Sequence, residues 1–391
     1  MTGRWIAASG RDGKNKAVSP PKLTSRLESS IAPAALRHCL FVGVLFSATS
    51  LAVAQQPTAT DSSMPKSQSQ IRLVVHGGAG TIDRAEMTPE REREHRDGIA
   101  RALKAGWQVL QRGGTSLDAV EAAVRVFEDD ANFNAGKGSV FTSAGTNEMD
   151  AAIMDGKTLK AGAVANLQHV KNPITFARLL LEKAELLASK STSPKVGPLF
   201  MAGEEAEAFA REQGIELVDA KYFFTQRRWD ALQKIKQAEK GGGGAGKSFI
   251  ITDADRHGTV GAVALDRDGN LAVATSTGGT TNKKPGRIGD SPIIGGGTYA
   301  NNATCAVSCT GDGEFFIRAA VAHNVSTLMQ YRGMKLQEAA ETALAEAKAL
   351  GGEGGLIAVD KDGNIALPFN TSGMYRGYVD ADGKFVVEIY R

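Results

Sequence analysis

Two runs of alternating small and apolar residues, joined by a short polar turn, predict a β-hairpin in the second half of the chain. The first run lies within residues 257–266, and the second begins at Leu271, after the sequence Asp-Arg-Asp-Gly-Asn. A period of two is typical of a strand, and the glycine of the turn can take the positive φ that a tight turn requires. With a three-residue loop, counting back along both strands places Thr259 opposite Thr277, with Cβ atoms about 4.5–5.5 Å apart.

Apolar patterns on both sides of this hairpin predict further elements. Thr88 and Pro89 are typical of a helix start; this helix is expected to end at Gly113, and Ser116 is expected to cap the next one. Other helices are expected at residues 173–188, 204–213, 226–240, 315–329 and 335–350. Strands are expected at residues 71–75, 148–156, 162–165 and 303–310, and a second hairpin at residues 354–369.

Together these elements predict an α+β fold. The two hairpins are expected to share one sheet, while the strands of the N-terminal half form another. Helices follow both sets of strands and would cover the outer faces of the sheets. The expected architecture is therefore a four-layer αββα sandwich.

Composition indicates a globular protein with a full-sized core. The chain has 391 residues, of which 42% are hydrophobic and 23% are charged. No pattern along the sequence indicates a second hydrophobic core. Seven Lys and Arg against two acidic residues give residues 1–54 a charge of +5, whereas the whole chain carries +3. The remainder therefore carries −2, and we expect no nucleic-acid partner.

The N-terminal segment has the pattern of a secretory signal peptide. A basic region precedes the apolar run Leu40–Leu51, which is followed by Ala-Val-Ala at residues 52–54. We therefore expect residues 1–54 to be removed on export to the periplasm or on secretion, and residues 55–70 to form a disordered polar tether. An uncleaved membrane anchor is the alternative, although the apolar run is short for a span.

A glycine-rich segment at residues 240–247 predicts a flexible linker. Residues 241–248 also satisfy the phosphate-loop pattern, but a polar helix rather than a strand is expected before them, so no nucleotide is expected to bind. Cys305 and Cys309 are expected to be free, buried thiols, because an extended strand holds residues four apart too far from each other for a disulfide.

The two opposed threonines suggest chemistry at the open end of the hairpin. Two structural threonines of a strand are the simpler interpretation, because threonine favours strands. If the chain is cut between Gly258 and Thr259, however, Thr259 gains an α-amine with a pKa of about 7.7–8.0. That amine can take the proton of the same residue's hydroxyl, so one residue supplies both nucleophile and base.

Arg287 and Asp290 are candidates for binding an amino acid, since they share a loop bounded by Gly and Pro. Arg can hold a carboxylate through two parallel hydrogen bonds, and Asp can accept from an ammonium group. A surface ion pair between the two is the alternative. His76, at the end of the first strand, is expected to be structural because nothing beside it in sequence suggests a partner.

Four motifs carry a resemblance to a known family. They are His257–Val263, Thr275–Gly279, Pro285–Pro292 and Ser308–Glu314. In order and spacing they resemble the plant-type asparaginase and isoaspartyl peptidase family of N-terminal-nucleophile hydrolases, from about Ile71 to about Tyr375. The resemblance implies an αββα fold and an autocatalytic cut between Gly258 and Thr259. The products would be subunits of residues 71–258 and 259–391, assembled as an (αβ)2 heterotetramer.

The resemblance also implies a role for each candidate residue. Thr259 is the nucleophile, Thr277 orients it, and the Thr310 hydroxyl and the Gly311 amide stabilise the oxyanion. The residues implied for substrate binding are Arg287, Asp290, Gly313 and Asn134. The resemblance implies no redox or organic cofactor, but a structural sodium ion held by main-chain oxygens of Glu128, Phe133 and Ala135, which fits the preference of hard cations for oxygen.

The implied activity is the hydrolysis of isoaspartyl dipeptides and L-asparagine with release of aspartate. A glycosylasparaginase of the same class is one alternative, although Gly258 stands where glycosylasparaginases carry Asp. Asp312 stands where close relatives often carry a small hydroxylated residue, which leaves the shape of the substrate pocket open. The other alternative is an uncleaved periplasmic protein that binds amino acids through Arg287 and Asp290 without chemistry.

Overall fold

The computed structural model describes residues 71–391, apart from residues 81, 83, 86, 189–196, 241–257 and 381. The predicted signal peptide at residues 1–54, the tether at residues 55–70, and residues 241–247 of the predicted linker lie outside the described residues. Within the described part of the chain, no helix is both long and apolar enough to cross a bilayer.

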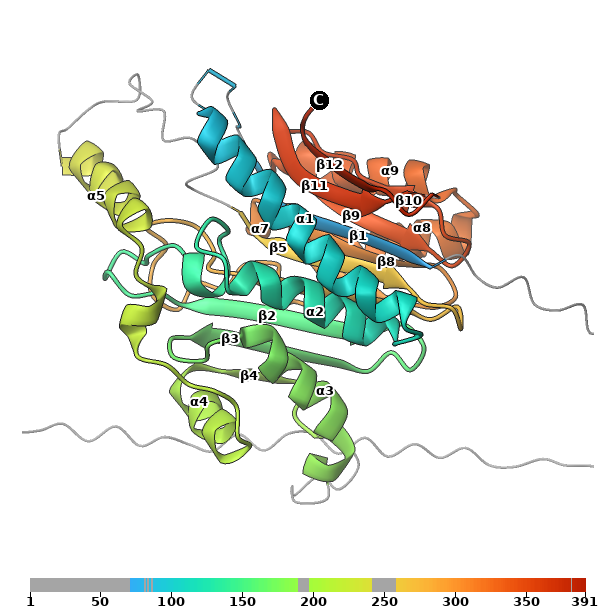
Figure 1. Cartoon of the computed structure of the whole chain (residues 1–391), viewed down its shortest axis with the longest axis horizontal. Helices are drawn as coiled ribbons and strands as arrows, with labels where there is room; N and C mark the ends of the chain where they lie inside the picture. Colours follow the sequence, from blue (N-terminus) through green and yellow to red (C-terminus); the bar gives the residue numbers. More distant parts are fainter. Residues whose placement is uncertain are drawn as a thin grey trace, which may run out of the picture. The chain divides into compact units, whose positions relative to one another are not determined.

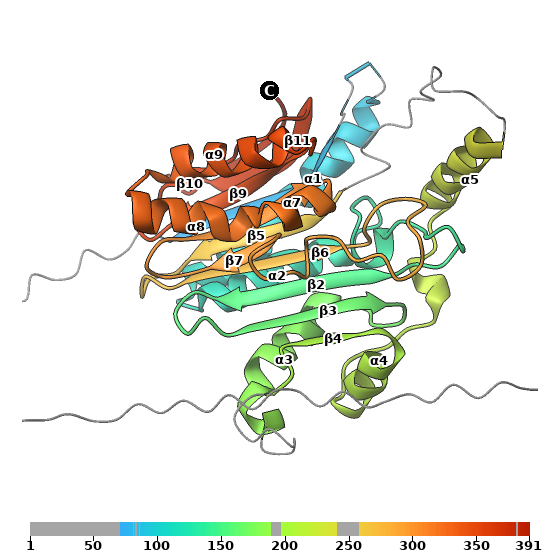
Figure 2. The same cartoon turned by 180° about the vertical axis from the view of Figure 1, so that it is seen from behind.

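Two β-sheets occupy the centre of the described structure (Figures 1 and 2). The larger sheet has the strand order β12-β11-β1-β5-β6-β2-β3-β4, and the smaller has the order β10-β9-β8-β7. The strands of the larger sheet are β1 (Arg72–Gly80), β2 (Met149–Asp155), β3 (Ala161–Leu167), β4 (Phe200–Ala202), β5 (Val260–Leu265), β6 (Leu271–Thr277), β11 (Gly373–Val379) and β12 (Phe385–Tyr390). Those of the smaller sheet are β7 (Thr298–Ala300), β8 (Cys305–Gly311), β9 (Gly354–Asp360) and β10 (Ile365–Ala366).

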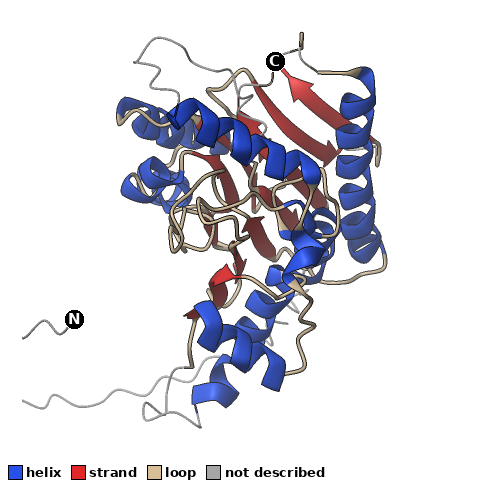
Figure 3. Ribbon diagram, turned by 90° about the vertical axis from the view of Figure 1, so that its left-hand side faces the viewer, coloured by secondary structure: helices blue, strands red, loops and turns tan. Residues whose placement is uncertain are grey.

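Helices cover the outer face of each sheet, so that the strands lie between helices on opposite sides (Figure 3). The described helices of the N-terminal half are α1 (Pro89–Gln111), α2 (Ser116–Glu128), α3 (Pro173–Ala188), α4 (Gly203–Glu212) and α5 (Gln226–Lys240). Those of the C-terminal half are α7 (Gly313–Arg318), α8 (Val321–Arg332) and α9 (Leu336–Ala349). Helices α1, α2 and α3 pack on the larger sheet and α8 and α9 on the smaller one, which confirms the predicted αββα sandwich.

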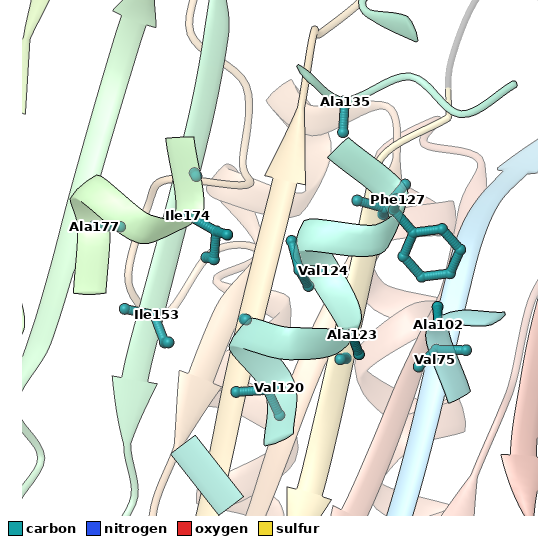
Figure 4. Close-up of a cluster of buried hydrophobic side chains, with 14 of the residues drawn as sticks. Val75, Ala102, Val120, Ala123, Val124, Phe127, Ala135, Ile153, Ile174 and Ala177 are labelled. Carbon is teal, nitrogen blue, oxygen red and sulfur yellow. The ribbon is translucent and has the colours of Figure 1, made fainter. Parts of the chain in front are cut away.

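Apolar side chains fill the three spaces between the four layers. Figure 4 shows part of the cluster between the larger sheet and its helices, where Phe127 and Val124 of α2 pack over the strands. Along β5, Ala262 joins this cluster while Val263 joins the one between the sheets, as a period of two requires. Cys305 and Cys309 are free and buried under α8 and α9, as predicted, where they form part of the third cluster.

The register of the central hairpin is the predicted one. Val260 pairs with Ser276 and Leu265 with Leu271, so the same register places Thr259 opposite Thr277. The turn closes with a hydrogen bond from the Asp266 amide to the Asn270 carbonyl at 3.0 Å, and its glycine takes φ +78°. Pairing and turn chemistry therefore act together to fix where the two threonines meet.

The assignment of both hairpins to one sheet was wrong. The β5–β6 hairpin lies in the larger sheet between β1 and β2, whereas β9 and β10 belong to the smaller sheet. Every residue of β5 is buried, and β1 pairs along it from Arg72 opposite Leu265 to His76 opposite Gly261. A periodic pattern identifies a strand but not the neighbour with which it pairs, and here strands from the N-terminal half take both sides of the hairpin.

Two helix boundaries also differ from the prediction. The helix expected at residues 315–329 is two helices, because Ala320 takes a left-handed φ of +47° between α7 and α8. The first amides of α8 donate to the carbonyls of Gly295 and Gly296, a contact with a distant loop that local sequence does not reveal. Thr115, not Ser116, caps α2, since the Thr115 side chain accepts a hydrogen bond from the Asp118 amide.

Four strands of the structure were not predicted from the sequence: β4, β7, β11 and β12.

Candidate active site

Thr259 lies directly before β5, where the chain enters the larger sheet, and only 7% of it is exposed. Its Oγ1 donates a hydrogen bond to Thr277 Oγ1 at 3.1 Å and lies 3.4 Å from Ser291 Oγ. Thr277 Oγ1 also accepts from the Gly279 amide at 3.0 Å, which fixes its position. The predicted pair of threonines is therefore in direct contact.

Glycine allows two segments to meet at the predicted cleavage site. Gly78 of β1 takes φ +116°, and a Cβ on it would lie 2.6 Å from the Cα of Gly258. Gly258 itself takes φ +151°, and its own missing Cβ faces Asn134. A larger residue at Gly78 would combine a clash with backbone strain, whereas at Gly258 the strain of the positive φ is the main cost. The residue before Thr259 is thus held in a conformation that favours glycine.

Asn134 lies beside Gly258, but its side chain has other partners. It is fully buried, its Nδ2 donates to the Gly279 carbonyl at 2.7 Å, and its Oδ1 accepts from the Val140 amide at 3.0 Å. Its main-chain carbonyl accepts from the Gly278 amide. Asn134 therefore ties the loop after α2 to the end of β6, and through it shapes the site.

Thr310 and Gly311 end β8 of the smaller sheet, close to the same junction. Thr310 is fully buried, and its Oγ1 accepts from the amide of Ala79, the neighbour of Gly78, at 3.3 Å. Gly311 takes φ +147°, and a Cβ there would lie 2.2 Å from the Glu353 carbonyl oxygen. The ends of the two sheets thus bring the predicted oxyanion residues to the side of the predicted cleavage site.

Asp290 and Gly313 are in contact, as expected for a shared binding site. A Cβ on Gly313 would lie 2.9 Å from Asp290 Oδ1, so only glycine leaves this carboxylate uncovered. Asp290 is 3% exposed, and burial raises its pKa to about 6, against the opposing effect of Arg287. Its Oδ2 has no hydrogen-bond partner among the described residues. A buried acceptor of this kind suits an ammonium group.

Arg287 pairs with a residue that the sequence analysis missed. Its Nε and Nη2 donate to the two carboxylate oxygens of Glu314 at 2.9 and 2.8 Å, which replaces the alternative of an Arg287–Asp290 pair. The third nitrogen, Nη1, lies 3.4 Å from the position that a Cβ on Gly279 would take. Glu314 therefore holds one edge of the guanidinium and leaves Nη1 directed toward the end of β6. In the sequence, Glu314 is the last residue of the motif Ser308–Glu314, but nothing there indicates that it pairs with Arg287.

Comparison with known proteins decides the family. The asparaginase family model matches residues 69–389. The chain belongs to the asparaginase family. It is 48% identical over 321 residues to an isoaspartyl peptidase from Escherichia coli, which covers 82% of this chain and 96% of that protein. Isoaspartyl peptidase/L-asparaginases from Mus musculus and Xenopus laevis are 43% and 41% identical, each over 77% of this chain and over 86% and 90% of their own lengths.

Membership of the asparaginase family confirms the resemblance found in the sequence. A threonine nucleophile and autocatalysis are general to this family, so the chain is a hydrolase. The Thr259 and Thr277 hydroxyls, in contact at 3.1 Å, are the candidates for such chemistry in this chain.

The asparaginase site also contains a buried lysine that the sequence analysis did not select. Lys283 is 5% exposed, and its Nζ donates to the Glu148 carbonyl at 2.8 Å. Burial lowers the pKa of Lys283, and burial raises that of the neighbouring Asp150, which is fully enclosed. Lys283 and Arg287 both lie beside Gly279, so the loop after β6 is held between two cations.

The loop predicted to bind sodium presents main-chain oxygens at two glycines. A Cβ on Gly136 would lie 2.2 Å from the Glu128 carbonyl oxygen, and one on Gly138 would lie 1.9 Å from that of Phe133. The Ala135 carbonyl accepts from the Gly138 amide at 3.1 Å. The described side chains contain no cluster of three His, Cys, Asp or Glu for a metal. The carbonyl groups of Glu128 and Phe133 lie against the two glycines of this loop, and that of Ala135 is part of its internal hydrogen bonding.

Proposed function

We propose that this asparaginase-family chain is an isoaspartyl peptidase and L-asparaginase that cuts itself between Gly258 and Thr259. The observation that carries the proposal is the position of the Thr259 hydroxyl. Thr259 directly follows Gly258, whose backbone conformation is constrained, and Thr259 Oγ1 lies 3.1 Å from Thr277 Oγ1. A buried threonine at that junction can serve first the cleavage and then the hydrolysis.

Cleavage begins when Thr259 Oγ1 attacks the carbonyl carbon of Gly258. The C–N bond breaks, the acyl group of Gly258 moves to the hydroxyl oxygen, and the nitrogen becomes the free α-amine of Thr259. Water then hydrolyses the ester, which releases Gly258 as a carboxylate and regenerates the hydroxyl. The new amine has a pKa near neutrality, so it can accept the hydroxyl proton in the next reaction.

In hydrolysis of substrate, Thr259 Oγ1 attacks the side-chain carbonyl carbon of asparagine or of an isoaspartyl residue. The Thr310 hydroxyl and the Gly311 amide stabilise the negative oxygen, typically by about 3–4 kcal/mol for each donor. The amine of Thr259 passes its proton to the leaving group, which departs as ammonia or as the second amino acid. Water hydrolyses the acyl-enzyme and releases aspartate.

Substrate recognition follows from the two charged residues of the loop after β6. The buried carboxylate of Asp290 accepts the α-ammonium group, and Arg287 binds the α-carboxylate through the nitrogen that Glu314 leaves available. Gly313 keeps Asp290 uncovered, and Asn134 holds the adjoining loops. This arrangement supports a substrate with a free α-amino acid end.

We further propose that the main-chain oxygens of Glu128, Phe133 and Ala135 hold a sodium ion, which stabilises the loop that carries Asn134.

We also propose export through the signal peptide at residues 1–54 and assembly of two cleaved chains as an (αβ)2 heterotetramer. N-terminal sequencing of protein from the periplasm and light scattering test these two proposals.

The Thr259→Ala variant tests the central proposal, because one residue has both roles. Wild-type protein should show two chains by intact mass, one beginning Thr-Val-Gly-Ala, and should release aspartate from β-Asp-Leu. Thr259→Ala should remain a single chain with no measurable turnover, whereas Thr259→Ser, which keeps a hydroxyl, should still be cut. A cut chain in the alanine variant would contradict autocatalysis, and faster hydrolysis of a glycosylated asparagine than of β-Asp-Leu would change the assigned substrate.

A further inference from the structure

Four buried polar side chains form a continuous hydrogen-bonded row between the two sheets, close to the nucleophile. They are His76 of β1, Ser308 of β8, Thr275 of β6 and Thr298 of β7, each with no exposed surface. His76 Nε2 lies 2.8 Å from Ser308 Oγ, Ser308 Oγ lies 2.8 Å from Thr275 Oγ1, and Thr275 Oγ1 lies 2.7 Å from Thr298 Oγ1. The row ends at the main-chain carbonyl of Ser291, 2.8 Å from Thr298 Oγ1.

Every side chain of the row has a partner within hydrogen-bond distance. Thr298 Oγ1 has two acceptors beside it, the Ser291 carbonyl and Thr275 Oγ1, and donates its single proton to one of them. Ser308 Oγ lies between Thr275 Oγ1 and His76 Nε2, each at 2.8 Å. The row is therefore continuous from the ring of His76 to the Ser291 carbonyl.

His76 is a neutral ring beside the nucleophile. Burial lowers its pKa to about 3, and Nδ1 has no hydrogen-bond partner among the described residues. The main chain of Thr259 lies close enough to the ring to shift the pKa the other way. His76 therefore links the row to the residue that carries the nucleophile.

Both ends of the row meet Thr259. The ring of His76 lies beside its main chain, while Ser291, whose carbonyl ends the row, places its own Oγ 3.4 Å from Thr259 Oγ1. Between these ends the row lies against β5, since a Cβ on Gly261 would come 2.0 Å from Ser308 Oγ and 2.4 Å from His76 Nε2. A shift in the row would move either the backbone or the hydroxyl environment of Thr259.

We infer that His76, Ser308, Thr275 and Thr298 are positioning residues, which hold the Thr259 hydroxyl in line for attack through a chain of buried hydrogen bonds. This inference rests on the proposed function. His76 acts through Ser308, because its Nε2 lies 2.8 Å from Ser308 Oγ. Loss of one hydroxyl from the row would leave a buried polar group unpaired, which is costly.

The test breaks the row at Thr275, which touches neither Thr259 nor the substrate residues. Thr275→Val keeps the shape and removes the hydroxyl, and Thr275→Ser keeps the hydroxyl. For the cleaved protein we expect Thr275→Val to lower kcat for β-Asp-Leu about 10- to 100-fold with KM nearly unchanged, because misplaced reacting groups slow chemistry. Thr275→Ser should recover most of the wild-type kcat.

Thr304→Val is the matched control, because it removes a buried hydroxyl bond of similar kind, 2.6 Å from Ser326 Oγ, within the C-terminal half. Thr304→Val should lower thermal stability and leave kcat unchanged.

Two results would overturn the inference while the proposed function stands. One is a wild-type kcat in folded, cleaved Thr275→Val, and the other is an equal loss of kcat in Thr304→Val. If Thr275→Val does not fold, Thr298→Val against Thr298→Ser applies the same test. Failure of the proposed function would instead appear as an uncut, inactive wild-type chain.

Discussion

Asp290 is a buried carboxylate, and its burial should make recognition of an amino acid depend on pH. Its pKa is raised to about 6, so the side chain is ionised above this pH and neutral below it. A neutral Asp290 no longer attracts an α-ammonium group. We therefore expect the ratio of kcat/KM for L-asparagine over its deamino analogue succinamate to fall, by up to about tenfold for each pH unit below 6.

The ratio isolates Asp290 from the other group that titrates nearby. The amine of Thr259 acts on both substrates alike, so its protonation cancels in the comparison. Asp290→Asn should give a low ratio that does not change with pH. A wild-type ratio that stays constant from pH 5 to pH 8 would show that Asp290 does not bind the ammonium group.

Residues of the site differ in how far the sequence could place them. Thr259 and Thr277 were placed correctly, since their contact depends on one hairpin whose turn and period are local. The pairing of Glu314 with Arg287 was missed, because the loop after β6 and the start of α7 meet only in the fold. Lys283 was missed for a similar reason, since its burial depends on strands β2 and β6 lying side by side.

At the scale of elements, two glycines determine how closely α1 and β1 approach Phe133. A Cβ on Gly98 of α1 would lie 2.4 Å from the Phe133 ring, and one on Gly77 of β1 would lie 2.5 Å from it. Phe133 is 1% exposed and also packs edge-on against Phe127, at 4.6 Å between centroids, so it cannot move aside. The ring thus occupies space that both elements leave open.

Gly98→Ala should therefore destabilise the protein, although alanine favours a helix. Helix propensity contributes about 1 kcal/mol in favour of alanine, but overpacking a filled core costs about 1–3 kcal/mol. We expect a net loss of up to about 2 kcal/mol in the free energy of unfolding, measured with urea. Lys104→Ala, an exposed position of the same helix, should change it by less than about 0.5 kcal/mol. A more stable Gly98→Ala variant would mean that Phe133 can repack.

Element boundaries were predictable where the signals were local. Thr88 and Pro89 start α1 as expected, and the ranges of α3 and α5 match the prediction. The break at Ala320 and the placement of the β9–β10 hairpin in the smaller sheet were not predictable, because both depend on contacts with distant segments.

At the scale of the whole molecule, the proposed cut does not separate two independent units. In the larger sheet β1 precedes the cut, yet it lies between β11 and β5, which both follow it. Strand β2 likewise pairs with β6 across the cut, from Asp150 opposite Thr277 to Asp155 opposite Ala272. The order of strands therefore alternates between the two future chains.

This interleaving predicts that the cleaved chains unfold together and separate only under denaturing conditions. Each chain alone would expose strands whose backbone groups are paired by the other, and unpaired buried groups are costly. The two chains should elute as one species from a sizing column in buffer and as two in guanidinium, and the cleaved protein should show a single thermal transition. Residues 71–258 expressed alone should fail to give a folded, soluble chain. Two species in buffer would contradict the proposed subunit boundary, because a cut between Gly258 and Thr259 leaves the sheet held by both chains.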